Sequence, residues 1–330
     1  MVSRRHVVLA LGATALAAPF PDFAQQPPQR VFRVGFLSTG GRTPDGSAPA
    51  ALREALRVQG YIEGRNIVYE ARFAGGVFER VPGLAAELVQ LKVDLIVTAG
   101  WPATLAAKQA TSSIPIVMAP AAGDAVATEL ITSLARPGGN VTGMSDESVQ
   151  LSAKRMQLLK EAVPKAALIA VLWNTNDQGM TMRYRGIDKA ARMLQVEVQA
   201  YGVRGPDDFA SAFDAMTKRR PDAIFLVSDT LTRENRKRLI DFAATNRIPA
   251  MYEYSFYVHD GGLMSYGPSA DDGFREAAIY VDRILKGAKA ADLPVQQPTR
   301  YYLTLNRTAA AALGLTIPSS LLLRADDVID

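Results

Sequence analysis

Short apolar runs alternate along the chain with longer stretches in which apolar residues recur at helical spacing. The short runs are rich in Val, Ile and Leu, which is typical of strands covered on both faces. Such strands alternating with amphipathic helices predict βαβ units and parallel sheets. We expect strands at 31–38, 67–73, 94–100, 114–119, 141–144, 167–173, 196–203, 223–227, 249–252, 262–266 and 301–305. We expect helices at 51–59, 79–91, 128–135, 148–162, 181–194, 206–218, 232–246 and 272–285, and another that begins beside Pro102.

The pattern of strands and helices starts again near residue 146, and it contains too many units for one compact core. The 330 residues are enough for two domains of ordinary size. No long polar or Gly/Ser-rich stretch separates the two halves. The sequence therefore predicts an α/β protein with two Rossmann-like lobes, joined by short crossings that act as a hinge.

The first 24 residues have the pattern of an export signal. Arg4 and Arg5 precede an uncharged, mostly apolar run of 12 residues, 7–18. That run is shorter than the roughly 20 residues a membrane-spanning helix needs, although an uncleaved anchor stays open as an alternative. Cleavage after Ala17, Ala18 or Ala24 would release a periplasmic protein, and the paired arginines are compatible with twin-arginine export.

Composition narrows the function classes. The chain has no cysteine and two histidines, so disulfides, thiolate metal sites and a Cys nucleophile are excluded. The net charge of +4 comes from 37 basic and 33 acidic residues without a dense basic run, which argues against a nucleic-acid surface. The sequence contains neither a Gly-x-Ser-x-Gly elbow nor a phosphate-binding loop. We therefore expect a binding protein without cofactor or metal, not an enzyme.

Ligands of open parallel sheets bind outside the carboxyl ends of the strands. The residues at those ends give the candidate ligand-binding set: Ser38, Thr39, Gly100, Trp101, Pro102, Asp124, Asn174, Asn176, Ser228, Asp229, Tyr252 and Glu253.

This mixture of small polar, acidic and aromatic residues suits a small polar ligand with an apolar part. We expect a ligand carboxylate at the Ser38 and Gly100 loops and any ligand ammonium at Glu253 or Asp229. Structural roles remain open for the same residues: helix capping for the small polar ones, core packing for Trp101, and an internal salt bridge with an arginine for Glu253.

Five segments carry a resemblance to a known family: LREALRVQGYIEGRN (52–66), IPIV (114–117), LARPGGNVTG (134–143), GGLMSYG (261–267) and ALGLTIPSS (312–320). They resemble the substrate-binding proteins of ABC transporters with the type I periplasmic fold, in the group that includes binders of tryptophan and other aromatic amino acids. The family often has Asp-Pro-Val where this chain has Asp124-Ala125-Val126, so that loop is expected to differ.

The resemblance implies three crossings between the lobes. The first lobe would hold 31–145 plus 270–290, and the second 146–269 plus 291–330. It also implies a monomer that closes on a small amino-acid-like or aromatic carboxylate ligand and delivers it to a membrane permease driven by an ATPase. A sensor that presents ligand to a membrane receptor and a two-lobed periplasmic enzyme are the alternatives. A repressor of this fold would need a DNA-binding module where the export signal stands.

Overall fold

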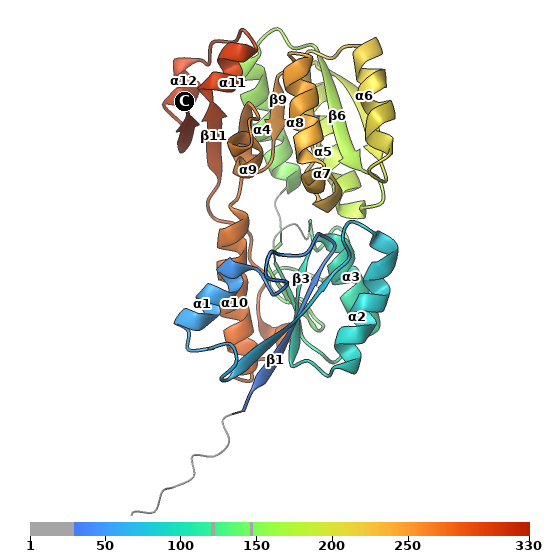
Figure 1. Ribbon diagram of the computed structural model, residues 1–330, viewed down its shortest axis with the longest axis vertical. Helices are drawn as coiled ribbons and strands as arrows, with labels where there is room; N and C mark the ends of the chain where they lie inside the picture. Colours follow the sequence, from blue (N-terminus) through green and yellow to red (C-terminus); the bar gives the residue numbers. More distant parts are fainter. Residues whose placement is uncertain (1–29, 120–122, 146–147) are drawn as a thin grey trace, which may run out of the picture. The chain divides into compact units, whose positions relative to one another are not determined.

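The computed structural model describes residues 30–119, 123–145 and 148–330, and residues 31–330 form one compact unit. The predicted export signal at 1–24 lies outside the described residues. Within the compact unit, the strands form two separate sheets of five and seven strands. Each sheet is the centre of one α/β lobe, as the alternation of strands and helices predicts (Figure 1).

The first lobe contains a parallel sheet in the order β2-β1-β3-β4-β5. Its strands are β1 (Phe32–Ser38), β2 (Ile67–Phe73), β3 (Leu95–Ala99), β4 (Ile116–Met118) and β5 (Val141–Gly143). Its helices are α1 (Ala50–Val58), α2 (Val81–Gln90), α3 (Trp101–Ala110) and α10 (Ala270–Leu285), with the 3₁₀ turns η1 (Phe78–Arg80) and η2 (Ala290–Asp292).

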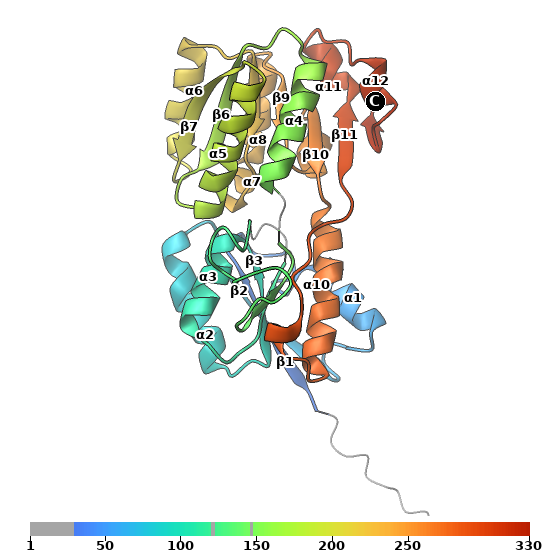
Figure 2. The same ribbon diagram turned by 180° about the vertical axis from the view of Figure 1, so that it is seen from behind.

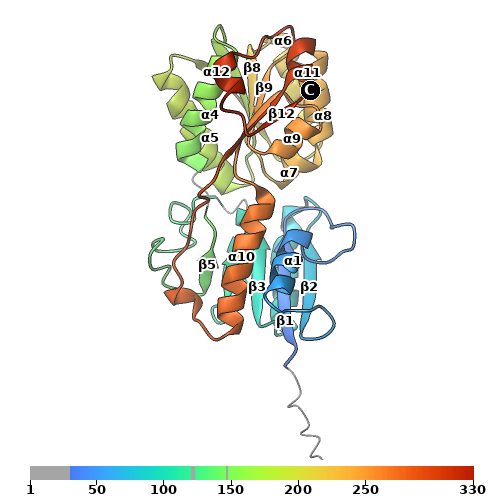
Figure 3. The same cartoon turned by 90° about the vertical axis from the view of Figure 1, so that its left-hand side faces the viewer.

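Helices cover both faces of this sheet. On one face, α1 buries Leu52 and Leu56, and α10 buries Ala277 and Val281. Each pair is four residues apart, so its side chains lie on one stripe of the helix. Figure 3 shows α1 and α10 in front of the sheet, and helices α2 and α3 pack on the opposite face (Figure 1). Full burial of a leucine side chain contributes about 1.5–3 kcal/mol, so these stripes hold the helices against the sheet.

The second lobe contains a sheet in the order β12-β11-β10-β9-β8-β6-β7. Its strands are β6 (Leu168–Asn174), β7 (Glu197–Val203), β8 (Ala223–Leu226), β9 (Ala250–Tyr252), β10 (Met264–Gly267), β11 (Tyr302–Asn306) and β12 (Asp327–Ile329). Its helices are α4 (Ser148–Ala162), α5 (Gln178–Met193), α6 (Asp208–Lys218), α7 (Thr230–Glu234), α8 (Arg236–Thr245), α9 (Ser255–His259), α11 (Arg307–Ala312) and α12 (Ser319–Leu322).

Strand β6 shows why both faces of this sheet are covered. Ile169 and Val171 join the cluster that includes α4 and α5, whereas Ala170 and Leu172 join the cluster that includes α6 and α8. Successive strand side chains point to opposite faces, so a continuous apolar run needs helices on both sides. Figure 2 shows α4 and α5 in front of the sheet, and α6 and α8 lie on its other side.

The chain passes between the sheets three times: between Ser145 and Ser148, between β10 and α10, and between η2 and β11. The last crossing lies later than the sequence predicts. Leu293 accepts a hydrogen bond from Thr142, Val295 donates to the Leu134 carbonyl, and Gln296 bridges to Met144. Residues up to 296 therefore pack on the first lobe, whereas the sequence reading placed 291–296 in the second.

Three other expectations need correction. The helix expected at 128–135 is a series of turns, because Glu129 has φ +60 and Pro137 follows closely. The second sheet is not wholly parallel, because β11 runs antiparallel to β10 after the excursion into the first lobe. The C-terminal segment, where no strand was expected after 301–305, contributes the short strand β12 parallel to β11.

Candidate functional site

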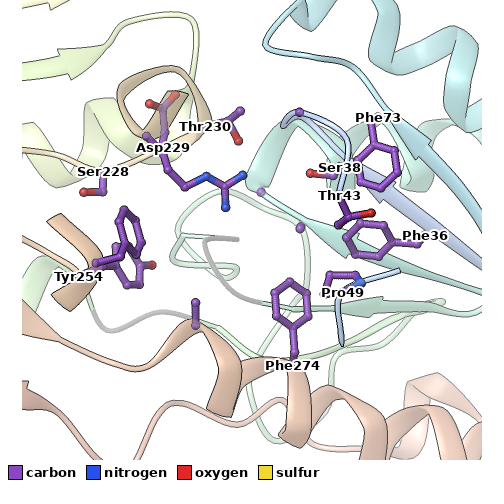
Figure 4. A pocket seen from close by; sticks show the side chains of 16 residues that line it. Phe36, Ser38, Thr43, Pro49, Phe73, Ser228, Asp229, Thr230, Tyr254 and Phe274 are labelled. Carbon is purple, nitrogen blue, oxygen red and sulfur yellow. The ribbon is translucent and has the colours of Figure 1, made fainter. Parts of the chain in front are cut away.

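A pocket with a cavity volume of about 220 Å³ lies between the carboxyl end of β1 and the segment that follows β8. Both lobes line it, and Figure 4 shows their labelled side chains facing each other across it. The first-lobe lining consists of Phe36, Ser38, Gly41, Thr43, Pro49, Phe73, Ala99, Gly100, Ala270 and Phe274. The second-lobe lining consists of Ser228, Asp229, Thr230, Arg233, Tyr254 and Phe256.

The parallel register of the first sheet brings part of this wall together. Ser38 ends β1 and pairs with Phe73 of β2 on one side and with Ala99 of β3 on the other. Carboxyl ends of parallel strands meet at one edge of a sheet, so three residues far apart in sequence become neighbours there. The Ser38 hydroxyl accepts a hydrogen bond from the Gly40 backbone at 3.0 Å, which fixes the turn that leaves β1.

Aromatic side chains form most of the apolar wall. In the first lobe the Phe36 ring lies 5.7 Å from the Phe73 ring and 6.2 Å from the Phe274 ring. In the second lobe Tyr254 and Phe256 stack at 5.6 Å. Aromatic pairs prefer tilted or offset contacts at such separations and offer edges and faces to a third ring. The pocket is therefore suited to a flat apolar group.

Asp229 supplies a buried carboxylate to this wall. It is the N-cap of α7, where Oδ1 accepts a 2.9 Å hydrogen bond from the Thr232 backbone N–H. The Thr232 hydroxyl in turn accepts a hydrogen bond from the Asp229 backbone N–H. Oδ2 accepts a 2.6 Å hydrogen bond from the Asn174 amide. Burial raises the pKa of Asp229, although these hydrogen bonds oppose the shift. A carboxylate oxygen accepts more than one hydrogen bond, so Oδ2 can still receive a ligand donor.

Arg233 supplies the opposite charge one helical turn away. Its backbone N–H donates to the Asp229 carbonyl at 3.0 Å, so both side chains come from the same short helix. The Arg233 side chain lines the pocket and remains exposed. Within the described residues, its guanidinium forms no salt bridge with a protein carboxylate. The pocket thus presents an anion and a cation in neighbouring positions beside an aromatic wall.

Glu253 lies in an internal salt bridge and not in the ligand-binding position predicted for it. Its carboxylate accepts hydrogen bonds from Nη1 of Arg155 at 3.0 Å, from Nη1 of Arg183 at 2.8 Å and from the Ser228 backbone N–H at 3.0 Å. It is fully buried and does not line the pocket. The internal salt bridge, which was the structural alternative, is the arrangement present. Its bond to Ser228 supports the segment that carries Asp229.

The structure divides the predicted site residues into two groups. Those that line the pocket are Ser38, Gly100, Ser228 and Asp229. Those that do not line it are Thr39, Trp101, Pro102, Asp124, Asn174, Asn176, Tyr252 and Glu253.

Local contacts explain several of the second group. Trp101 is buried at the start of α3, where a Cβ added to Gly179 of the second lobe would lie 3.5 Å from the Trp101 Cβ. Asp124 caps its own turn through the Val126 and Ala127 N–H groups. The Tyr252 ring stacks on Tyr257 inside the second lobe.

Sequence reasoning missed Arg233 and the four phenylalanines that line the pocket, Phe36, Phe73, Phe256 and Phe274. Phe73 ends a predicted strand, so the strand-end rule that selected Ser38 would also have selected it. Arg233 lies four residues after Asp229, on the same face of the predicted helix. Phe274 belongs to a helix that the chain reaches only after crossing back from the second lobe, and nothing local in the sequence indicates that it faces the pocket.

Several known proteins are similar to the chain over most of its length. A tyrosine-binding protein from Clostridioides difficile is 28% identical over 264 residues, which make up 79% of this chain and 75% of that protein. A conserved domain protein from Vibrio cholerae has a TM-score of 0.85 at 27% identity. An ABC domain in complex with L-Trp from Streptococcus pneumoniae has a TM-score of 0.84 at 25% identity. Both structural comparisons cover 91% of this chain and 100% of the other.

The family of ABC transporter substrate binding proteins matches residues 47–329. That match includes both sheets apart from β1, and 12 of the 16 residues that line the pocket. In the described part of the chain, no helix has the length and apolar character needed to cross a bilayer. Two α/β lobes around a shared pocket, the sequence match and the structural neighbours agree: this chain belongs to the ABC transporter substrate-binding protein family and has the type I periplasmic binding fold.

Proposed function

We propose that this protein is the periplasmic solute receptor of an ABC uptake transporter and that it binds a free amino acid with an aromatic side chain. One observation carries the choice of ligand. Asp229 and Arg233, of opposite charge and one turn apart, face a pocket whose apolar wall is largely aromatic. A zwitterion with an apolar ring is the small molecule that complements all three features.

Asp229 is the partner for the ligand ammonium. Its carboxylate is buried and held in one orientation by Thr232 and Asn174, so no rearrangement is needed on binding. A buried carboxylate without a cation is costly, and a ligand ammonium that donates to Oδ2 offsets that cost. An amine-free analogue would leave the carboxylate unpaired, so this contact selects for amino acids over simple acids.

Arg233 is the partner for the ligand carboxylate. A guanidinium presents parallel N–H donors that match a carboxylate. Arg233 is exposed and Asp229 is buried, so the ligand carboxylate would lie nearer to solvent than the ligand ammonium. Ser38 and Gly100, on the opposite wall, are further polar contacts for the same group.

The aromatic wall is the partner for the ligand side chain. Phe36, Phe73 and Phe274 come from the first lobe, whereas Tyr254 and Phe256 come from the second. A ring placed between them contacts both lobes at once. Only contacts made with both lobes favour the closed state over the open one, so the ring, together with the two charges, would drive closure.

Two named relatives support this choice, since one is a tyrosine-binding protein and the other was solved with L-Trp. Membership of the family supports delivery to a permease and its ATPase. The predicted export signal supports a periplasmic location. The protein would act by capture and release, without chemical conversion of the ligand.

Calorimetric titration of the mature protein tests the proposal. The panel is L-Trp, L-Tyr and L-Phe, with L-Leu and L-Glu as amino acids that lack the ring and a pentose as a solute that lacks the charges. We expect the aromatic amino acids to bind most tightly and to raise the melting temperature by mass action. Tighter binding of L-Glu or of the pentose would contradict the proposed ligand class.

A further inference from the structure

A hydroxyl pair connects the two lobes beside the pocket. Oγ1 of Thr39, in the loop after β1, lies 2.6 Å from Oγ1 of Thr230, the first residue of α7. Thr39 is 2% exposed and does not line the pocket. Either hydroxyl can donate, and each is the other's partner across the boundary between the lobes.

Glycines allow the second lobe to approach this closely. A Cβ on Gly40 would lie 2.6 Å from Nη2 of Arg233, and a Cβ on Gly76 would lie 2.8 Å from Oε2 of Glu234. A Cβ on Gly41 would lie 3.0 Å from Oε1 of the same glutamate. The end of α7 therefore lies close to three first-lobe glycines, at which a side chain would crowd Arg233 or Glu234.

The two first-lobe loops that face α7 are bonded to each other. The Gly76 backbone N–H donates to the Thr39 carbonyl at 2.9 Å, and the Gly75 N–H donates to the Gly40 carbonyl at 2.9 Å. These bonds tie the loop after β1 to the loop after β2. The Thr39 backbone is thus bonded within the first lobe and does not depend on α7 for these bonds.

From these contacts we infer that Thr39 and Thr230 form an interlobe latch, which sets the affinity for every ligand of the pocket although Thr39 touches none. When the lobes part, both hydroxyls bond to water. When they meet, each replaces water with the other, and the loss of one hydroxyl would leave the second without that partner. A buried hydroxyl without a partner destabilises the closed state by more than the hydrogen bond itself stabilises it, so the closed state depends on both residues.

The latch also places the pocket residues of α7. Thr230 is the first residue of that helix and Arg233 lies one turn further on, over Gly40. Thr39 is therefore a positioning residue, which acts on the ligand through α7. This inference rests on the proposed function, since it assumes that the ligand is held by closure of the two lobes.

The variant Thr39→Val tests the latch, because valine keeps the shape of threonine and removes the hydroxyl. We expect about a three- to tenfold loss of affinity, seen mainly as faster dissociation and equal for L-Phe and 3-phenylpropionate. The melting temperature of the ligand-free protein should stay unchanged. Since Thr230 itself lines the pocket, the double variant with Thr230→Val should lose less than the sum of the two single losses.

The first lobe supplies a matched control. Thr98 and Thr104 form a buried hydroxyl pair at 2.8 Å within that lobe. Thr98→Val should lower the melting temperature and leave ligand affinity unchanged, which is the opposite of the Thr39→Val result. If Thr39→Val instead lowers the melting temperature and spares affinity, or changes neither, the latch is refuted.

A distance measurement separates failure of the latch from failure of the proposed ligand class. The chain has no cysteine, so Val58→Cys and Met193→Cys, exposed on α1 and α5, accept a spin-label pair across the two lobes. Thr39→Val should shift the label distances of the ligand-free protein toward the open form, whichever solute binds. An unchanged distribution would overturn the latch, whereas failure of all aromatic amino acids to bind would overturn only the ligand assignment.

Discussion

The side-chain amide of Asn174 donates a 2.6 Å hydrogen bond to Oδ2 of Asp229, and both residues are buried. Asn174 ends β6, and Asp229 follows the neighbouring strand β8. The bond therefore connects the ends of two adjacent strands and holds the carboxylate that we assign to the ligand ammonium. Asn174 acts from behind the pocket, which it does not line.

Replacement of Asn174 tests that support. Asn174→Ala should lower the free energy of unfolding by about 1.5–3 kcal/mol, because a hydrogen bond to a buried charged group is lost. It should also lower the affinity for L-Phe, since Oδ2 is no longer held toward the ligand. Denaturant unfolding and calorimetry measure the two effects. Unchanged affinity in a protein that has lost stability would limit Asn174 to a structural role.

Glu253→Gln separates the internal ion pair from a ligand contact. The change removes the charge of a carboxylate that pairs with two buried guanidinium groups, so we expect a loss of about 3–5 kcal/mol of stability. Any loss of affinity should be the same for L-Phe and for 3-phenylpropionate, because Glu253 does not face the ligand. Selective loss of amino-acid binding in a stable Glu253→Gln protein would return the ammonium contact to Glu253.

Asp177 predicts how stability depends on pH. This buried residue is the N-cap of α5, and burial, followed by repulsion from Asp229, raises its pKa to about 7. The ordinary pKa of an aspartate is 3.8, so between pH 4 and 7 the folded protein holds a proton that the unfolded chain has released. Stability therefore falls as pH rises through this interval.

Asp177→Asn should remove that dependence. Asparagine is also a good N-cap, so the bond to the Met180 N–H can be kept. We expect the variant to be more stable than the parent at pH 8, by about 1–3 kcal/mol, and to match it near pH 4. Thermal unfolding across this range measures the difference. Parallel pH profiles for the two proteins would show that Asp177 does not hold the proton.

The aromatic wall predicts a loss confined to ligands with rings. Phe274 is only partly buried, so Phe274→Ala should cost little folding stability. Removal of a ring that contacts the ligand side chain should lower L-Phe affinity by about tenfold, and Phe274→Leu should recover part of it. Equal losses for L-Phe and for a small amino acid such as L-Ala would argue against a ring in this part of the pocket.

The sequence predicts the fold better than the site. Continuous Val/Ile/Leu runs of the β6 type identify strands because parallel sheets bury both faces, and that signal is local. The antiparallel strand β11 depends on the path of the chain through the other lobe, which no local pattern encodes. The same limit applies to the helix expected at 128–135, where apolar spacing was present but the left-handed Glu129 prevents a helix.

The candidate site also contains residues that local sequence identifies and residues that depend on long-range packing. The strand-end rule identifies Ser38, Gly100, Ser228 and Asp229, because each directly follows or ends a buried strand. It cannot say whether an acidic residue in such a place meets a ligand or an arginine. Glu253 meets Arg155 and Arg183, from helices 98 and 70 residues away in the sequence. Contacts of that range are set by packing, so the structure is needed to tell the two acids apart.

The assignment of Asp229 to the ligand ammonium is the central claim. Its most direct test is calorimetric titration of the parent and Asp229→Asn proteins with L-Phe and 3-phenylpropionate, which differ by the amino group. Asparagine keeps the cap of α7 and removes the charge. The account predicts at least about a tenfold loss of L-Phe affinity with unchanged or tighter binding of 3-phenylpropionate. Equal losses for the two compounds, or no loss for either, would contradict it.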